Sequence, residues 1–165
     1  MKVIGIDPGL SGAIAVLENN KVLNMFDMPV MSEGKKNKKQ LNSALLVNLI
    51  KENIHNREEV AVVVEQVNAM PGQGVTSMFN FGQTFGAIKG ICAALELPIF
   101  FVRPSKWKKH FELINSSKDS SRTKAIEMYP KLSNQLAKKK DVNKSDAILI
   151  ARFFSETRLT DEIKS

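Results

Sequence analysis

The chain has 165 residues, of which 43% are hydrophobic, so it can form one domain that buries roughly two-thirds of the surface of its unfolded form. Its apolar stretches are shorter than the roughly 20 residues that a membrane-spanning helix needs, and its one cysteine, Cys92, excludes an internal disulfide, so we expect a cytoplasmic protein without a membrane partner and with Cys92 buried. Its 24 Lys and Arg outnumber its 17 Asp and Glu, and the net charge of +7 favours a polyanionic partner.

The first part of the chain predicts an antiparallel meander of three strands, at residues 2–7, 12–17 and 21–28. β-branched residues alternate in the first two segments, and the turn formers Pro8 and Gly9 separate them. Asn19 and Asn20 tolerate positive φ and suit a hairpin before the third strand. Asp7 therefore ends the first strand.

The middle of the chain predicts a basic loop at residues 31–39 and a helix at residues 40–54. The apolar run 59–65 is typical of a strand buried on both faces, and Glu65 stands at its end. Hydrophobic residues at helical spacing predict a long helix over 74–95, and Pro98 precedes a strand at 99–102. Three helices follow, near residues 104–111, 121–128 and 143–157.

These elements predict an α/β fold with a five-stranded mixed sheet flanked by helices. The sheet combines the three-stranded antiparallel meander with two parallel strands. A right-handed crossover places the Glu65 strand beside the first strand, so Asp7 and Glu65 end neighbouring strands. We expect one domain over residues 1–158 and a C-terminal tail at 159–165.

The excess lysines and arginines form three groups, within residues 35–39, 103–109 and 138–144. Such groups suit nucleic acid, because each neutralised phosphate releases condensed counterions. For any one group, a solvated surface is the alternative. Three groups in a short chain favour nucleic acid.

Three carboxylates stand where chemistry is expected. Asp7 alternatively bonds to its own turn, and Glu65, after a Val-rich run, alternatively forms an ion pair with a lysine. Asp146 begins the last helix on its inward-facing stripe, where the helix dipole also favours an acid. Asn143 or Asp141 is expected to cap that helix, with Asn143 favoured.

If the three acids converge, cations must compensate their repulsion. Two like charges about 4 Å apart repel by roughly 4 kcal/mol at an effective dielectric of 20. Oxygen ligands without His or Cys at metal spacing point to Mg²⁺ or Mn²⁺. Two such ions can activate a water and stabilise the leaving oxygen of a phosphodiester. The expected chemistry is therefore metal-dependent phosphodiester hydrolysis.

Three segments resemble the acidic motifs of RuvC-type Holliday junction resolvases, in particular the phage and bacterial RuvC-like branch. They are Ile-Gly-Ile-Asp-Pro-Gly-Leu-Ser-Gly at 4–12, Val-Glu-Gln-Val at 64–67 and Ser-Asp-Ala at 145–147. Arg103-Pro104 and Trp107-Lys108 are similar to a further feature of that branch. The resemblance runs from Met1 to about Phe154, and leaves open whether the host is a bacterium or its virus.

The resemblance implies a ribonuclease H-like homodimer that acts in DNA recombination and repair. Each subunit would cut one strand of a four-way junction, with two Mg²⁺ ions, replaceable by Mn²⁺, at Asp7, Glu65 and Asp146. The family has a fourth acid where this chain has Asn143. Either Asn143 coordinates through its carbonyl oxygen or Asp141 reaches in, and we favour Asn143.

The resemblance and the basic groups also suggest which residues contact DNA. Some relatives place an aromatic residue where this chain has Asn68, so Met70 or Phe79 is the candidate to separate bases, unless Phe79 is a core residue. Lys118 and Arg122 resemble residues that touch the scissile phosphate, with a solvated surface as the alternative. The expected DNA-binding residues are Lys106, Lys108, Lys109, Lys118, Arg122 and Met70.

Two other classes of function compete with a nuclease. An actin-like ATPase or sugar kinase also begins with a strand, an Asp and a Gly-containing turn, but needs two such domains and a second phosphate loop. We therefore expect no nucleotide cofactor. A non-cutting module that binds branched DNA is the second alternative, because the fourth acid is missing. The presence of all three remaining acids favours the enzyme.

Overall fold

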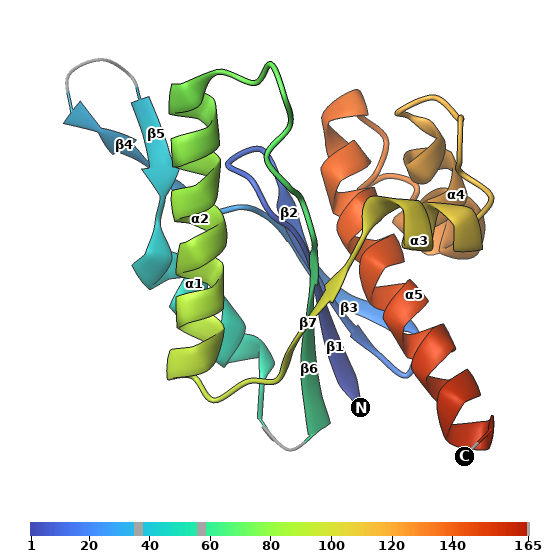
Figure 1. Ribbon diagram of the computed structural model, residues 1–165. Coiled ribbons are helices and arrows are strands. Elements are labelled where there is room, and N and C mark those ends of the chain that lie inside the picture. The colour runs from blue at the N-terminus through green and yellow to red at the C-terminus, as the bar shows by residue number, and fades with distance from the viewer. Residues whose placement is uncertain (35–37, 56–58, 165) are drawn as a thin grey trace.

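The computed structural model describes residues 1–34, 38–55 and 59–164, with side chains described through residue 158. A central sheet lies between two helical layers (Figure 1). The strands are β1 (Lys2–Asp7), β2 (Ala13–Glu18), β3 (Lys21–Asp27), β4 (Val30–Glu33), β5 (Lys38–Leu41), β6 (Val60–Glu65) and β7 (Ile99–Val102). The helices are α1 (Ser43–Asn53), α2 (Val75–Ala94), α3 (Pro104–His110), α4 (Ser120–Met128) and α5 (Val142–Lys164), with short 3₁₀ turns η3 (Pro130–Leu132) and η4 (Lys139–Asp141).

The five-stranded sheet has the order β3-β2-β1-β6-β7, and it confirms the predicted mixed sheet. β1 pairs antiparallel with β2, and β2 with β3, whereas β6 runs parallel to both β1 and β7. The turn between β2 and β3 places Asn19 at φ 49° and Asn20 at φ 62°, as expected for a hairpin built on asparagine.

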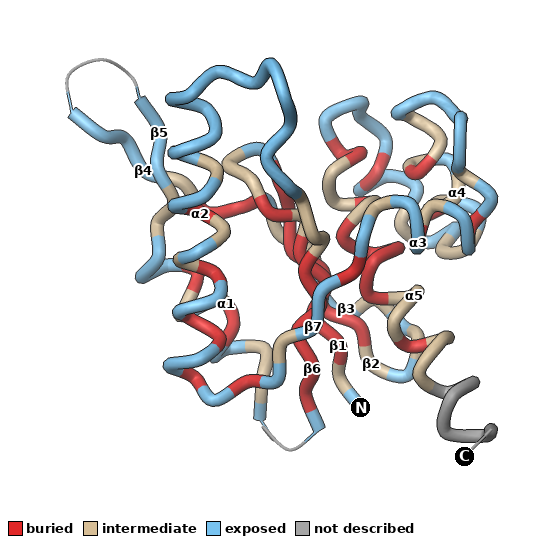
Figure 2. Tube along the Cα trace, viewed as in Figure 1, coloured by how far each residue is buried: buried red, intermediate tan, exposed pale blue. Residues whose placement is uncertain are grey.

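The two faces of the sheet are covered by different helices. Alternate residues of β1 and β6, such as Ile6 and Val64, lie in a core cluster with residues of α1 and α2. Their neighbours Val3 and Val63 lie in a second cluster with residues of α3, α4 and α5. Figure 2 shows that buried residues concentrate in the sheet and on the inner sides of the helices. Because side chains alternate along a strand, residues 7 and 65 continue the α5 face.

The packing of α5 on β1 depends on a glycine. A Cβ at Gly5 would overlap the carbonyl oxygen of Ala147 and would also crowd Ala151. The small residues on both elements let the helix approach the strand backbone closely. This approach fixes the start of α5 beside the end of β1.

The structure corrects two predicted boundaries. The predicted loop at 31–39 contains a hairpin of two exposed strands, β4 and β5. Their sequences have no alternating apolar pattern that would predict strands. Residues 35–37 lie outside the described residues. The first helix consequently begins at Ser43 rather than Gln40, after Asn42, whose Oδ1 accepts a hydrogen bond from the Leu45 amide at 3.0 Å.

The expectation for Cys92 is confirmed, because its side chain lies on the buried face of α2. In the part of the chain that the structure describes, no helix has the length and apolar character needed to cross a bilayer.

Candidate active site

Asp7 and Glu65 lie side by side at the carboxyl ends of neighbouring parallel strands. The last paired residues of these strands are Ile6 and Val64, so Asp7 and Glu65 occupy the next step of the ladder. Adjacent strands are about 4.8 Å apart, and both residues lie on the face that α5 covers. The sheet therefore presents two carboxylates to the same space.

Asp146 approaches the same space from α5. It lies in the second turn of the helix, directly before Ala147, the residue whose carbonyl oxygen meets Gly5. Asp7, Glu65 and Asp146 are all partly buried. Their charges act on one another, since both other acids raise the pKa of Asp7 and Glu65 also raises that of Asp146. The predicted convergence of an edge of the sheet with the start of the last helix is present.

Asp7 has the most perturbed carboxyl of the three. Burial raises its pKa from 3.8 to about 8, assisted by the charges of Glu65 and Asp146 and opposed by those of Lys118 and Lys108. A group with such a pKa carries a proton at neutral pH. A cation bound at this place would displace that proton, because it favours the ionised form.

Glu65 is held by a tryptophan. Burial raises its pKa, while a hydrogen bond from Trp107 and the charge of Lys108 lower it. The indole Nε1 of Trp107 donates to Oε2 of Glu65 at 2.6 Å. Among the described residues Glu65 forms no ion pair with a lysine, which was the alternative role for this acid.

Asp146 lies beside the buried Ser121 of α4. Burial raises the pKa of Asp146 from 3.8 to about 6, and the charge of Glu65 adds to this rise. The Ser121 hydroxyl and the charges of Lys108 and Lys118 lower the same pKa. The Ser121 hydroxyl does not reach full hydrogen-bond geometry with any group in the described part of the chain. Burial thus raises the pKa of all three acids, and repulsion by neighbouring acids adds to the rise at Asp7 and Asp146.

The site fits a hard divalent cation in donor type and charge. It offers carboxylate oxygens whose repulsion the described lysines do not fully compensate, and such oxygens are the ligands that Mg²⁺ and Mn²⁺ prefer. Within residues 1–34, 38–55 and 59–164, no group of three His, Cys, Asp or Glu side chains is already arranged to hold an ion. The donors are present, but their side chains do not form a closed cage.

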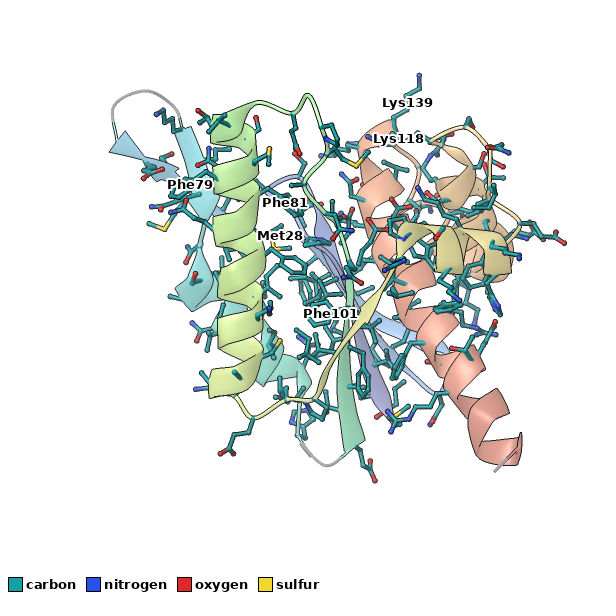
Figure 3. All side chains as sticks on the ribbon, viewed as in Figure 1. Met28, Phe79, Phe81, Phe101, Lys118 and Lys139 are labelled. Atoms are coloured by element: carbon teal, nitrogen blue, oxygen red, sulfur yellow. The ribbon has the colours of Figure 1, made fainter. Side chains whose placement is uncertain are left out.

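A cavity of about 320 Å³ opens beside Asp146. Lys108 and Lys118 line it together with Trp107, Leu113, Ser116, Ser117 and Ser121. Figure 3 shows Lys118 and Lys139 at the end of the molecule where α5 begins. The cavity therefore combines two cations and three hydroxyls next to a carboxylate, which suits a phosphate group.

The sequence matches no protein-family model and no curated protein. Solved structures do match: RuvC of Thermus thermophilus in complex with a Holliday junction substrate has a TM-score of 0.61 and 17% identity, with 96% of each chain covered. The chain has a RuvC-like fold.

Two further solved structures also resemble this chain in fold. A second structure of Thermus thermophilus RuvC has a TM-score of 0.55 and 19% identity, covering 96% of this chain and 97% of that one. The fowlpox virus Holliday junction resolvase has a TM-score of 0.55 and 16% identity, covering 96% and 99%. The ribonuclease H-like fold that the acidic motifs indicate is thereby confirmed.

In this RuvC-like fold, the two candidates for the fourth ligand have different surroundings. Asp141 is buried; its Oδ2 accepts from the Lys138 amide at 2.9 Å, and its Oδ1 lies 3.7 Å from Nζ of Lys144. Both of its oxygens are therefore engaged. Asn143 donates through Nδ2 to the Ser11 carbonyl, on the turn that follows Asp7, which leaves its Oδ1 unused by that bond.

The capping role that we favoured for Asn143 is wrong. α5 begins at Val142, so Asn143 is already helical, and its side chain points to Ser11 rather than back to the helix amides. Asp141 instead closes the preceding 3₁₀ turn.

The predicted DNA-binding residues fall into distinct environments. Lys108 lowers the pKa of all three carboxylates, and Lys118 that of Asp7 and Asp146. Lys106 and Lys109 are exposed on α3. All four lysines can contact phosphate, and Lys108 and Lys118 lie beside the carboxylates.

Arg122 is occupied within the chain. Its Nε and Nη2 donate to the carboxylate of Asp119 at 2.8 and 2.9 Å, and its Nη1 donates to the carbonyls of Leu136 and Ala137 at 3.1 and 3.0 Å. These bonds tie α4 to the segment that leads to α5. Arg122 is therefore better suited to a structural role than Lys118 is.

Met70 and Phe79 are both exposed, with 65% and 66% of their surfaces accessible. The alternative that Phe79 is a core residue is wrong, because the inward face of α2 is formed by Thr84, Ile88, Ile91 and Cys92. Figure 3 places Phe79 on the side of α2 towards β5. Both residues remain available to contact unstacked bases.

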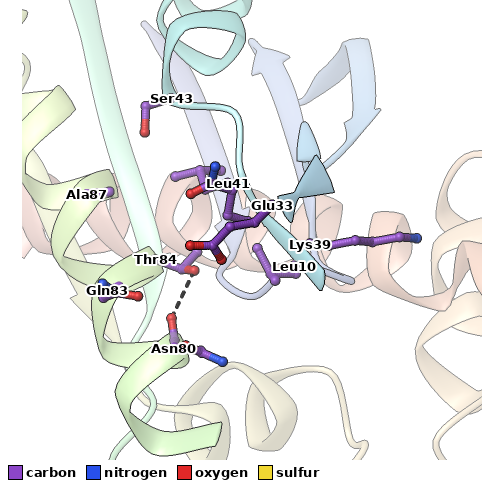
Figure 4. Close-up of a pocket in the computed structure, with 10 residues that line it drawn as sticks. Leu10, Glu33, Lys39, Leu41, Ser43, Asn80, Gln83, Thr84 and Ala87 are labelled. Atoms are coloured by element: carbon purple, nitrogen blue, oxygen red, sulfur yellow. Dashed lines mark hydrogen bonds between the residues drawn. The ribbon is translucent and has the colours of Figure 1, made fainter. Parts of the chain in front are cut away.

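A second, polar cavity of about 170 Å³ lies between the β4–β5 hairpin and α2 (Figure 4). Glu33 of the hairpin points towards Thr84 of α2, whereas the Lys39 side chain extends away from α2, and Thr84 donates to the Asn80 carbonyl at 3.1 Å. Leu10, three residues after Asp7, closes one side. The hairpin therefore flanks the turn that carries Asp7.

Sequence reasoning missed the roles of Trp107 and Ser121. Trp107 is part of a segment that resembles the RuvC-like branch, but a tryptophan in a basic helix does not by itself predict a hydrogen bond to a carboxylate 42 residues earlier. The buried position of Ser121 next to Asp146 has no local sequence signal. Both roles depend on how α3 and α4 fold back onto α5.

Proposed function

We propose that this protein is a structure-selective endodeoxyribonuclease that resolves four-way junctions or related branched DNA by metal-dependent hydrolysis of phosphodiester bonds. The observation that carries the proposal is the convergence of Asp7, Glu65 and Asp146: burial raises the pKa of all three, and repulsion by neighbouring acids raises those of Asp7 and Asp146 further. The RuvC-like fold supports it, since one solved structure of this fold is RuvC in complex with a Holliday junction substrate and another is named a Holliday junction resolvase.

In this proposal Asp7, Glu65, Asp146 and the carbonyl oxygen of Asn143 hold two Mg²⁺ ions, which Mn²⁺ can replace. When bound, the ions supply an activated water and stabilise the leaving oxygen. Asp7, whose pKa is raised by burial and by the neighbouring acids, would give up its proton on cation binding, because a bound cation favours the ionised form. Asn143 adds a ligand without adding a further charge to a site that already holds three acids.

Lys108 and Lys118 would hold the phosphate next to the carboxylates, from the wall of the cavity beside Asp146. Lys106, Lys109 and Lys39 would contact the backbone farther away, and Met70 or Phe79 would contact unpaired bases. Because several phosphates are neutralised, junction affinity should fall steeply between about 50 and 200 mM salt. A flat salt response would contradict this part of the proposal.

The active form in this proposal is a homodimer, so that two sites cut the junction symmetrically. α2 and the edge strand β7 form an apolar surface that nothing within the described chain fully covers. Val75 of α2 is 85% exposed, and Phe101 of β7 is 40% exposed. Between them, Gly82, Gly86 and Gly90 follow one another at four-residue spacing, and a Cβ on any of them would meet no atom within 4 Å. Such small residues let two helices approach closely.

The decisive experiment compares wild type with Asp7→Asn on a synthetic four-way junction in Mg²⁺. We expect paired nicks from the wild type, and from the variant junction binding without cleavage. A linear duplex of the same sequence is the control for structure selectivity. Cleavage that survives Asp7→Asn would refute the site assignment.

A second candidate function is a branched-DNA-binding module without catalysis. The observation that favours it is that Asn143 stands where relatives have an acid, while the nearby Asp141 is engaged by Lys138 and Lys144. Wild-type protein that binds the junction but does not cut it in Mg²⁺ or Mn²⁺ would establish this alternative. Nucleotide hydrolysis without DNA would instead favour an ATPase.

A further inference from the structure

Trp107 is the chain's one tryptophan, and its side chain is fully buried. An indole has a single hydrogen-bond donor, its Nε1–H, and here that donor is directed at Oε2 of Glu65 at 2.6 Å. The bond joins α3 to the end of β6. It is the only direct side-chain hydrogen bond to Glu65 among the described residues.

Several contacts hold Trp107 in this position. α3 begins at Pro104, immediately after β7, and Val102 of β7 is the register partner of Glu65. The Phe111 amide donates to the Trp107 carbonyl at 3.2 Å, and the Phe111 side chain is buried in the same cluster. One residue before it, His110 Nε2 lies 2.6 Å from Oε2 of Glu156 on α5. The helix is thus fixed at both of its ends.

The face of the same ring contacts a lysine. Lys108 Nζ lies 5.4 Å from the centroid of the Trp107 ring, within the range of a cation–π contact. Lys108 is also the cation that lowers the pKa of Asp7, Glu65 and Asp146. One buried side chain therefore touches both a carboxylate by its edge and a site lysine by its face.

We propose that Trp107 is a positioning residue for the metal-dependent reaction: it fixes Oε2 of Glu65 and holds Lys108 beside the carboxylates. This inference rests on the proposed function. Partners that hydrogen-bond a metal ligand orient it and tune its affinity for the ion. A residue that only filled the core would need neither the polar partner nor the cation.

The test uses two substitutions in the same core cluster. Trp107→Phe keeps an aromatic ring but removes the donor, whereas Phe111→Leu disturbs packing next to Trp107 and leaves the bond to Glu65 intact. Mn²⁺ affinity is measured by titration calorimetry, and thermal melting in EDTA reports stability. We expect Trp107→Phe to weaken Mn²⁺ binding about tenfold or more, and Phe111→Leu to bind Mn²⁺ like the wild type although its Tm falls.

Cleavage provides a second readout. For Trp107→Phe, the Mg²⁺ concentration that gives half-maximal junction cleavage should rise about tenfold, and saturating Mg²⁺ should restore most of the rate. Junction affinity measured in EDTA should stay close to that of the wild type. Equal Mn²⁺ affinity in Trp107→Phe and wild type, or equal losses in both variants, would overturn the positioning role.

The wild type separates this inference from the proposed function. Because Trp107 is the one tryptophan, Mg²⁺ added to the wild type should change its emission, whereas in Glu65→Gln the change should be much smaller. If the wild type neither binds metal nor cuts the junction, the proposed function fails and this inference falls with it. If the wild type binds metal and cuts but Trp107→Phe does so equally well, the inference alone fails.

Discussion

Gly5 of β1 lies directly against the carbonyl oxygen of Ala147 on α5, so closely that no side chain fits between them. Ala147 follows Asp146, and Gly5 precedes Asp7 by two residues on the same face of the strand. The distance between two candidate ligands is thus set by one backbone contact. Gly5→Ala would push α5 away from β1, so we expect both a lower Tm and a large loss of cleavage.

The size of the Gly5→Ala effect follows from overpacking, which typically costs about 1–3 kcal/mol and occasionally more. Chemical denaturation measures that loss in the metal-free protein. Mn²⁺ titration under conditions where the variant is fully folded should also show weaker binding. A variant that folds, binds Mn²⁺ and cuts like the wild type would show that α5 can approach Asp7 without the glycine.

Asp7 makes the stability of the metal-free protein depend on pH. Its carboxyl titrates near 3.8 when unfolded and near 8 in the fold, so the folded state binds the proton more tightly. The stability linked to this group is complete below pH 3.8 and is lost as pH rises towards 8. Asp7→Asn cannot ionise, so in EDTA at pH 8 it should be more stable than the wild type by up to about 5 kcal/mol, because each pKa unit corresponds to about 1.4 kcal/mol; the difference should shrink towards pH 4.

Urea denaturation at several pH values in EDTA measures this dependence. Asp27→Asn is the control, since Asp27 is an exposed carboxylate on β3 whose ion-pair partner is Lys144, at 3.7 Å. Mg²⁺ should stabilise the wild type and have little effect on Asp7→Asn. A wild type whose stability does not change between pH 5 and 8 relative to Asp7→Asn would contradict the raised pKa.

Lys118 and Arg122 should respond differently to substitution, although both were expected to contact the scissile phosphate. Lys118→Ala removes a cation from the cavity beside Asp146, so cleavage should fall about tenfold to a hundredfold with little change in Tm. Arg122→Ala removes the bonds to Asp119, Leu136 and Ala137, so its main effect should be a lower Tm. The reverse pattern, measured by melting and junction cleavage, would reassign both residues.

The sheet could be predicted because its signals are local. Alternating residues in β1 and β2, the Val-rich run before Glu65 and the asparagine turn each specify an element by themselves, and a right-handed crossover then places β6 beside β1. The candidate ligands followed from this topology. The β4–β5 hairpin could not be predicted, because its exposed strands have no apolar side to mark them.

The surroundings of the candidate ligands depend on contacts between distant segments. Arg122 has the same character in the sequence as Lys118, and only its bonds to Asp119 and to two carbonyls distinguish it. Phe79 is an aromatic residue of the kind that usually lies in a core, but α2 turns another face inward. Sequence patterns identify which residue types can act, whereas packing decides which of them have free polar groups.

The exposed face of α2 gives a test of the proposed homodimer. Gly86→Glu adds a charge where the isolated chain has open space, so it should leave the monomer folded and separate the subunits. Asn48→Glu, on the exposed side of α1, adds the same charge elsewhere. Light scattering should give a dimer for the wild type and Asn48→Glu and a monomer for Gly86→Glu. A monomeric wild type, or a dimeric Gly86→Glu, would contradict this interface.

Asn143→Asp tests whether position 143 faces the metal site. In the metal-free protein the substitution removes the Nδ2 donor to the Ser11 carbonyl and adds a fourth acid beside three that already repel one another. Losing the donor and facing one carboxylate with another should cost about 1–3 kcal/mol in EDTA.

With Mg²⁺ the carboxylate that Asn143→Asp adds becomes a ligand, so the loss of stability should shrink and Mn²⁺ should bind more tightly than to the wild type. Asn143→Ala loses both the donor and the carbonyl oxygen proposed as a ligand, so its loss of stability should be larger with Mg²⁺ than without. If Asn143→Asp and Asn143→Ala respond to Mg²⁺ in the same way, residue 143 does not coordinate the ion, and the site has three protein ligands.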